Sequence, residues 1–219
     1  MKLRFTSSLL VLLAALLVAP AIFAGPVTWT SWNSTGTNQV SGTLGGVGVT
    51  YSGGYFFAQT NNMGIDYWNP QAAYLSGTVS NAPDSQSVDI IAIGTGGQGE
   101  TITFSSPVTN PILAVISVNG PGLYFSAPFN VLSDGCGYWG CGNLYVGAGN
   151  LLYSNGEGTG AIQFPGTFTQ ITINEQGSEN WRGFTVGVLP TGTPEPGTLV
   201  MFGSGILGLA GILRRKINM

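Results

Sequence analysis

Short apolar runs separated by turn residues are the feature that most constrains how this chain can fold. Between residues 25 and 189, no long stretch repeats its apolar side chains every 3.6 residues, as an amphipathic helix would. Turn-forming residues break the sequence at short intervals instead, for example at residues 52–54, 94–99 and 119–122. The strand-length runs cover residues 27–32, 47–51, 55–59, 88–93, 101–104, 112–118, 123–126, 129–132, 144–146, 161–164, 168–173 and 184–189.

About ten short strands joined by frequent turns predict an all-β fold, an antiparallel β-sandwich of jelly-roll type. We expect this domain to occupy residues 25–189, with a signal helix before it and a short transmembrane helix after it. Only 7% of the chain is charged, and β-branched and aromatic residues are frequent in the middle. This composition argues against a disordered segment.

The charges of the middle are almost all negative. All nine acidic residues lie between Asp66 and Glu195, and Arg182 is the only basic residue in that stretch. An acidic domain with a single arginine is repelled by phosphate backbones. We therefore exclude nucleic acid as a partner.

Residues 1–24 have the three parts of a secretory signal peptide. Lys2 and Arg4 supply the charged start, residues 9–18 form the apolar run, and small residues follow. We predict cleavage by signal peptidase between Ala24 and Gly25, with residues 19–21 as an alternative site. An uncleaved membrane helix is the competing interpretation, and the short apolar run disfavours it.

Residues 198–219 form a second apolar segment that ends in positive charge. Residues 199–213 are uncharged, but their four glycines lower helix propensity, and the length is near the lower limit for a spanning helix. Arg214, Arg215 and Lys216 follow and would stay in the cytoplasm. We predict a marginal transmembrane helix, preceded by a Pro/Gly/Thr linker at residues 190–197.

This tail resembles the PEP-CTERM sorting signal of Gram-negative bacteria. The resemblance rests on Pro194, Glu195 and Pro196, the apolar segment and the basic end. It implies that an exosortase-type membrane protease processes the chain, after transient inner-membrane anchoring, for delivery to the cell surface or extracellular matrix. The tail also resembles the region named ice-binding protein C-terminal domain. A permanent membrane anchor with a coincidental triplet is the alternative.

Cys136 and Cys141 are the only two cysteines of the chain. A pair of cysteines in an exported domain predicts a disulfide, and the intervening glycines allow a short closed loop. Two free thiols are the alternative. Metal binding by this pair needs further ligands, and the chain contains no histidine.

The cysteine loop also carries Asp134, Tyr138 and Trp139. Aromatic rings on a stapled loop could stack on a sugar ring, and a nearby carboxylate could bind its hydroxyl groups. We therefore name these three residues as candidate contacts for extracellular polysaccharide. In the competing interpretation, the two rings fold back and cover one end of the core.

The catalytic inventory is sparse. Without histidine, Ser-His and Cys-His nucleophilic schemes are excluded, and the middle has no lysine. Glu157, Glu175 and Glu179 could supply a carboxylate pair for a glycan-active enzyme, but their Gly, Ser and Asn neighbours suggest solvated loops. Residues 155–158 and 174–180 lack the regular ligand spacing of a calcium loop. Ice binding would need a regular threonine array, which is also missing.

We therefore expect an exported surface or matrix protein that is not an enzyme and uses no cofactor or metal. Three hypotheses remain open at this point: a polysaccharide-binding surface protein, a glycan-active carboxylate enzyme, and a permanently membrane-anchored protein.

Overall fold

The computed structural model of the protein describes residues 26–94, 96–177, 179–190 and 205. The predicted signal helix, the sorting triplet, the basic end and almost all of the predicted transmembrane helix lie outside the described residues. Contacts divide the chain into Met1–Leu189 and Pro190–Met219, and only the first part is described in detail. Within the residues described, no helix combines the length and apolar character needed to cross a membrane.

One sheet, called sheet A, pairs its strands in the order β11-β10-β14-β8-β16-β6-β5, with β1 also paired to β16. Every pairing is antiparallel. Its strands are β1 (Thr28–Trp29), β5 (Phe57–Gln59), β6 (Ile90–Ile93), β8 (Ile112–Val118), β10 (Asn130–Gly137), β11 (Gly140–Gly142), β14 (Gly158–Gln163) and β16 (Arg182–Val188).

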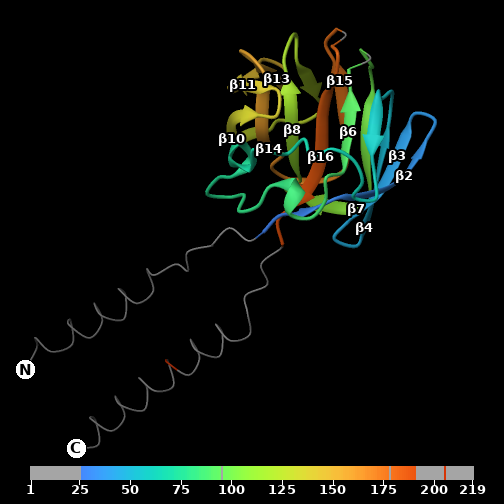
Figure 1. The fold of residues 1–219 in the computed structure, drawn as a ribbon. Helices are drawn as coiled ribbons and strands as arrows, with labels where there is room; N and C mark the ends of the chain where they lie inside the picture. The colour runs from blue at the N-terminus through green and yellow to red at the C-terminus, as the bar shows by residue number, and fades with distance from the viewer. Residues whose placement is uncertain (1–25, 95, 178, 191–204, 206–219) are drawn as a thin grey trace, which may run out of the picture. The chain divides into compact units, whose positions relative to one another are not determined.

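The other sheet, called sheet B, has the order β12-β13-β9-β15-β7-β4-β3-β2 and is also antiparallel throughout. The two sheets form a sandwich (Figure 1). The strands of sheet B are β2 (Ser31–Gly36), β3 (Gln39–Leu44), β4 (Val47–Ser52), β7 (Glu100–Thr109), β9 (Leu123–Phe125), β12 (Leu144–Gly147), β13 (Leu151–Ser154) and β15 (Thr167–Glu175).

The main core lies between the sheets. In sheet B, buried side chains alternate along a strand with side chains that face solvent. Ile171 and Ile173 of β15 are buried, whereas the polar residues beside them, Gln170, Thr172 and Asn174, are exposed or half-buried. An antiparallel sheet with one solvated face produces this pattern of apolar residues inside and polar residues outside. One face of sheet B is therefore open to solvent.

Sheet A is covered on both faces. Leu113 and Val115 of β8 belong to the main core, whereas Ile112, Ala114 and Ile116 belong to a second apolar cluster on the opposite side. That cluster is completed by Val27 and Trp29 and by residues from the long β5–β6 connection. This connection contains two short 3₁₀ turns, η1 (Gln71–Tyr74) and η2 (Pro83–Ser85). A strand buried on both faces reads as a continuous apolar run, as β8 does.

The antiparallel sandwich predicted from the sequence is therefore confirmed. The run at 112–118 coincides with β8, and every other predicted run overlaps a strand. Three strands were not predicted: β3, β11 and β13. The first contains a central glycine, the second lies in the cysteine segment expected to form a loop, and the third is a short apolar run between Gly and Asn residues.

Candidate ligand-binding pocket

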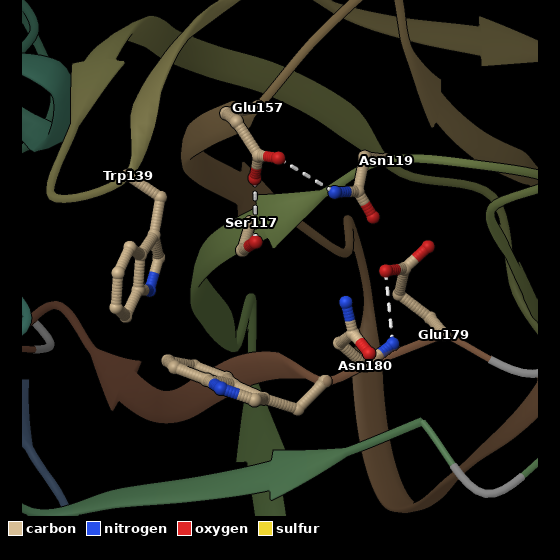
Figure 2. A pocket seen from close by; sticks show the side chains of 7 residues that line it. Ser117, Asn119, Trp139, Glu157, Glu179 and Asn180 are labelled. Atoms are coloured by element: carbon tan, nitrogen blue, oxygen red, sulfur yellow. Dashed lines mark hydrogen bonds between the residues drawn. The ribbon is translucent and has the colours of Figure 1, made fainter.

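A pocket of about 260 Å³ opens among loops that follow or precede strands of sheet A. Seven residues line it: Ser117, Asn119, Trp139, Glu157, Glu179, Asn180 and Trp181. In Figure 2, Trp139 and Glu179 lie on opposite sides of the pocket, with Glu157 between them near the end of β8. The lining thus combines two tryptophans, two carboxylates, two amides and a hydroxyl group from four separate chain segments.

Trp139 is placed by a disulfide-closed hairpin. Cys136 and Cys141 are directly opposed on β10 and β11, and their sulfur atoms are bonded, as the sequence predicted. Tyr138 and Trp139 occupy the two-residue turn between Gly137 and Gly140. A Cβ atom at Gly137 would collide with the side chain of Thr159 on β14. This glycine therefore allows the end of β10 to lie close to β14 in sheet A.

The same hairpin fixes Glu157. The backbone N–H of Glu157 donates to the carbonyl oxygen of Cys141 at 3.1 Å. Its carboxylate accepts one hydrogen bond from the Ser117 hydroxyl group at 2.6 Å and another from the Asn119 amide at 2.8 Å. These contacts hold the carboxylate of Glu157 at the wall of the pocket (Figure 2).

Ser117 reaches Glu157 because β8 is bulged. Gly158 pairs with Val118 and Gly160 with Val115, so the two pairs are two residues apart on β14 but three apart on β8. Ser117 lies in this interval with a φ of 56°, in the left-handed region that residues other than glycine rarely adopt. Bulges commonly redirect side chains beside functional sites, and this one directs the Ser117 hydroxyl group to a pocket carboxylate.

Trp181 forms the second aromatic wall. Its ring meets that of Trp139 at 6.0 Å and 79°, so the two rings form a corner. Phe57 and Tyr67, from β5 and the long β5–β6 connection, contact Trp181 edge-on at 5.2 Å each. The connection that covers sheet A therefore also supports the aromatic side of the pocket.

Glu179 and Asn180 come from the β15–β16 connection. The backbone N–H of Glu179 donates to the Gly94 carbonyl oxygen at 3.1 Å, which ties this loop to the end of β6. The Glu179 carboxylate accepts a hydrogen bond from the Asn180 backbone N–H at 2.9 Å. Among the described residues, no basic group forms an ion pair with Glu157 or Glu179.

A second acidic group lies nearby but away from solvent. The expectation that Glu175 occupies a solvated loop is wrong: it ends β15 and is 1% exposed. Its carboxylate accepts hydrogen bonds from the backbone N–H groups of Gly94 and Gly96 and lies 3.9 Å from the guanidinium of Arg182. Burial of the β15 end explains the error, because neighbouring polar residues in the sequence did not reveal it.

Glu100 shares this buried region. It is 3% exposed, and neither of its carboxylate oxygens has a hydrogen-bond partner within the described ranges. Burial, together with the negative charge of Glu175, raises the pKa of Glu100 to about 8. Burial also lowers the pKa of Arg182, although an arginine remains charged at neutral pH. Glu100 is therefore largely protonated at neutral pH.

The structure separates the three residues that the sequence analysis named as ligand contacts. Trp139 lines the pocket and is 52% exposed. Tyr138 is 44% exposed and contacts Trp139 and Tyr67, but it is not part of the lining. Asp134 is also outside the lining, and its carboxylate accepts the backbone N–H of Leu144 at 3.0 Å.

Sequence reasoning missed four of the lining residues as ligand contacts. Ser117 was counted only as part of a strand, and Asn119 only as part of a turn. Asn180 falls in the 174–180 segment considered for calcium, and nothing in the sequence separates Trp181 from a packing tryptophan. Glu157 and Glu179, considered as catalytic carboxylates, do line the same pocket.

The pocket does not have the composition of a metal centre. In the part of the chain that the structure describes, no three His, Cys, Asp or Glu side chains are grouped closely enough to hold a metal ion. The pocket's groups are instead aromatic faces, amides, a hydroxyl group and two carboxylates, which suit hydrogen bonding and stacking.

The fold and pocket thus define a β-sandwich with an aromatic and acidic pocket as its candidate binding site. Comparison with known families adds the tail: residues 193–216 match the PEP-CTERM protein-sorting motif. The chain therefore carries a signal that implies export, sorting across the membrane and exosortase-type processing. No curated protein and no solved structure matches the chain.

Proposed function

We propose that this chain is a cell-surface or extracellular-matrix protein whose β-sandwich binds polysaccharide without altering it. The observation that carries the proposal is the pocket formed by Trp139 and Trp181 with polar side chains between them. Flat aromatic rings pack on the C–H faces of sugars, and convergent polar groups bind the hydroxyls. The sorting motif supports delivery to the place where such polymers occur.

Delivery would use both ends of the chain. Residues 1–24 direct export and are removed by signal peptidase between Ala24 and Gly25. Residues 198–219 then anchor the chain transiently in the inner membrane, until an exosortase-type enzyme acts near residues 194–196. Mass spectrometry of the protein recovered from the cell surface tests this directly, because a peptide containing residues 214–219 would support the permanent anchor instead.

Glycan binding can be tested on an array with the full chain, purified in a polyoxyethylene detergent that carries neither sugar nor amine. Trp139→Ala should lower the affinity for any bound glycan by about tenfold or more, because an aromatic anchor is removed. Tyr153→Ala is the matched control: Tyr153 is an exposed aromatic residue of β13 outside the pocket lining. Binding that survives Trp139→Ala unchanged, or an array without any binding, would contradict the proposal.

A glycan-active enzyme is the second candidate, because Glu157 and Glu179 line one pocket. Glycoside hydrolysis requires two carboxyl groups that flank the bond to be broken. Each glycan that binds should therefore be incubated with the protein and analysed by mass spectrometry. Shorter products that disappear with Glu157→Gln would replace the binding proposal by a hydrolase, whereas unchanged glycans support binding alone.

A further inference from the structure

The lining of the pocket is acidic. It contains two carboxylates and no basic side chain. Within residues 26–94, 96–177 and 179–190, Arg182 is the only basic residue, and its guanidinium is buried beside Glu175. Arg182 is ion-paired with Glu175, and its charge also acts on Glu179, but its side chain does not line the pocket.

The local contacts of Glu157 and Glu179 leave room for a further partner. Glu157 is held by two neutral donors, the hydroxyl group of Ser117 and the amide of Asn119. Glu179 accepts a hydrogen bond from the Asn180 backbone. A carboxylate has about four acceptor sites, so both groups retain the capacity to bind a donor in the pocket.

The aromatic corner favours the same type of partner. The faces of tryptophan rings attract cations, and ammonium groups are bound by aromatic side chains that surround them. Trp139 and Trp181 meet at 79°, and the ring of Tyr67 contacts both, with its centroid 5.2 Å from that of Trp181 and 6.4 Å from that of Trp139. Two aromatic walls and two carboxylates around one small space match the requirements of an ammonium group.

We infer that the pocket binds an amino sugar with a free, protonated amine, as found in a deacetylated hexosamine polymer. This inference rests on the proposed polysaccharide binding and specifies its ligand class. The pocket of about 260 Å³ is below the usual range for drug-sized ligands, which fits one sugar unit rather than a large ligand. Because Trp139 is half exposed, the neighbouring units of a chain can extend out of the pocket.

Calorimetry with four oligosaccharides of equal length tests the inference on the full chain in the same detergent. They are a glucosamine tetramer, its N-acetylated form, a neutral glucose tetramer and a uronic acid tetramer. The glucosamine tetramer should bind at least about tenfold more tightly than the acetylated and neutral forms, and the uronic acid should bind least. Equal or tighter binding of the acetylated or neutral tetramer would overturn the amine preference while leaving polysaccharide binding intact.

If none of the four tetramers binds, and the glycan array is also empty, the proposed function itself fails. Choline provides a further arm, because it has a cation without a sugar. Choline that binds more tightly than the glucosamine tetramer, and competes with it, would overturn the sugar assignment. Weak or absent choline binding supports a site that recognises amine and sugar together.

Charge-neutralising variants locate the preference in the pocket. Glu179→Gln and Glu157→Gln should each weaken glucosamine binding by about tenfold, with a smaller effect on any neutral glycan. Asp84→Asn removes the same charge from η2, outside the lining, and should leave the affinity unchanged. Of the two variants, Glu179→Gln should disturb the fold less, because the Glu179 side chain is hydrogen-bonded only to the neighbouring Asn180 in the described structure. An equal loss with Asp84→Asn would reduce the preference to a general charge effect and overturn the inference.

Discussion

Two pairs of carboxylates lie near one another in this molecule and have opposite environments. Glu157 and Glu179 line an open pocket beside two tryptophans. Glu100 and Glu175 are almost completely buried, with Arg182 as their only cationic neighbour in the described chain. The same residue type therefore has two different physical roles within one region of the sandwich.

The two environments place different demands on a carboxylate. A buried charge is costly unless it is paired and hydrogen-bonded. Glu175 meets this requirement through Arg182 and two backbone N–H groups, whereas Glu100 meets it by keeping its proton to a higher pH. The pocket carboxylates are only partly buried and have no ion pair within the described chain, so water or a ligand can reach them. The buried pair should therefore govern stability, and the pocket pair should govern binding.

Removing Arg182 should produce the largest effect on stability. Arg182→Met would leave the charge of Glu175 buried without its cation and should lower the free energy of unfolding by about 3–5 kcal/mol. Urea denaturation measures this change. The double variant Glu175→Gln/Arg182→Met removes both charges and should recover part of the loss. A single variant that loses less than about 1 kcal/mol would contradict the role assigned to Arg182.

The protonation of Glu100 should make stability depend on pH. Its pKa is higher in the folded chain, about 8, than in the unfolded chain, where it has the ordinary glutamate value. The stabilisation that comes from protonated Glu100 is fully present below the ordinary pKa of glutamate. It is lost as the pH rises from that value through the pKa of Glu100 in the folded state. Between these limits, the Glu100 contribution to the free energy of unfolding should fall by about 1.4 kcal/mol per pH unit.

Glu100→Gln should flatten this pH dependence, because a glutamine cannot release the proton. Urea denaturation at several pH values between about 5 and 9, compared with the unaltered chain, measures the slope. Glu179→Gln, which alters a half-buried pocket carboxylate, should leave the slope nearly unchanged. An unaltered slope in Glu100→Gln would show that another group controls the pH response.

The fold was predictable because its signals are local. The continuous apolar run of β8 and the alternation in β15 follow directly from burial on two faces and on one face. The strand β3 was not predicted because Gly42 interrupts its pattern. That glycine is nevertheless required, since a Cβ atom there would collide with the Ser31 carbonyl oxygen on β2. Jelly-roll connectivity stays a prediction, as do the signal peptide and the transmembrane tail.

The pocket could be predicted only in part, because its residues come from distant segments. The cysteine pair pointed to a rigid turn, and that turn does carry Trp139 into the lining. Nothing in the sequence showed that Ser117 and Asn119 contact Glu157, since these contacts span 40 and 38 residues. The burial of Glu175 was also invisible, because it depends on the partner strands of the sheet rather than on neighbouring residues.

The disulfide should have an intermediate effect on stability and a clear effect on the pocket. Cys136 and Cys141 are separated by 5 positions, so replacing both by serine should lower the free energy of unfolding by no more than about 2 kcal/mol. The backbone carbonyl oxygen of Cys141 accepts a hydrogen bond from the backbone N–H of Glu157, so a looser hairpin would also displace this pocket residue. The variant should therefore also weaken glycan binding. Calorimetry below the unfolding temperature separates the two effects. Full affinity in the folded variant would show that the hairpin holds its shape without the bridge.

The smallest change in stability is expected from the pocket carboxylates themselves. Glu157→Gln and Glu179→Gln should each alter the free energy of unfolding by less than about 0.5 kcal/mol, since neither group is fully buried or ion-paired in the described chain. In Glu157→Gln, the new side chain would keep a carbonyl oxygen for the Ser117 or Asn119 donor, which limits the loss. Urea denaturation of both variants beside Arg182→Met provides the direct contrast. A destabilisation as large as that of Arg182→Met would make the pocket pair structural and erase the distinction between the two sets of carboxylates.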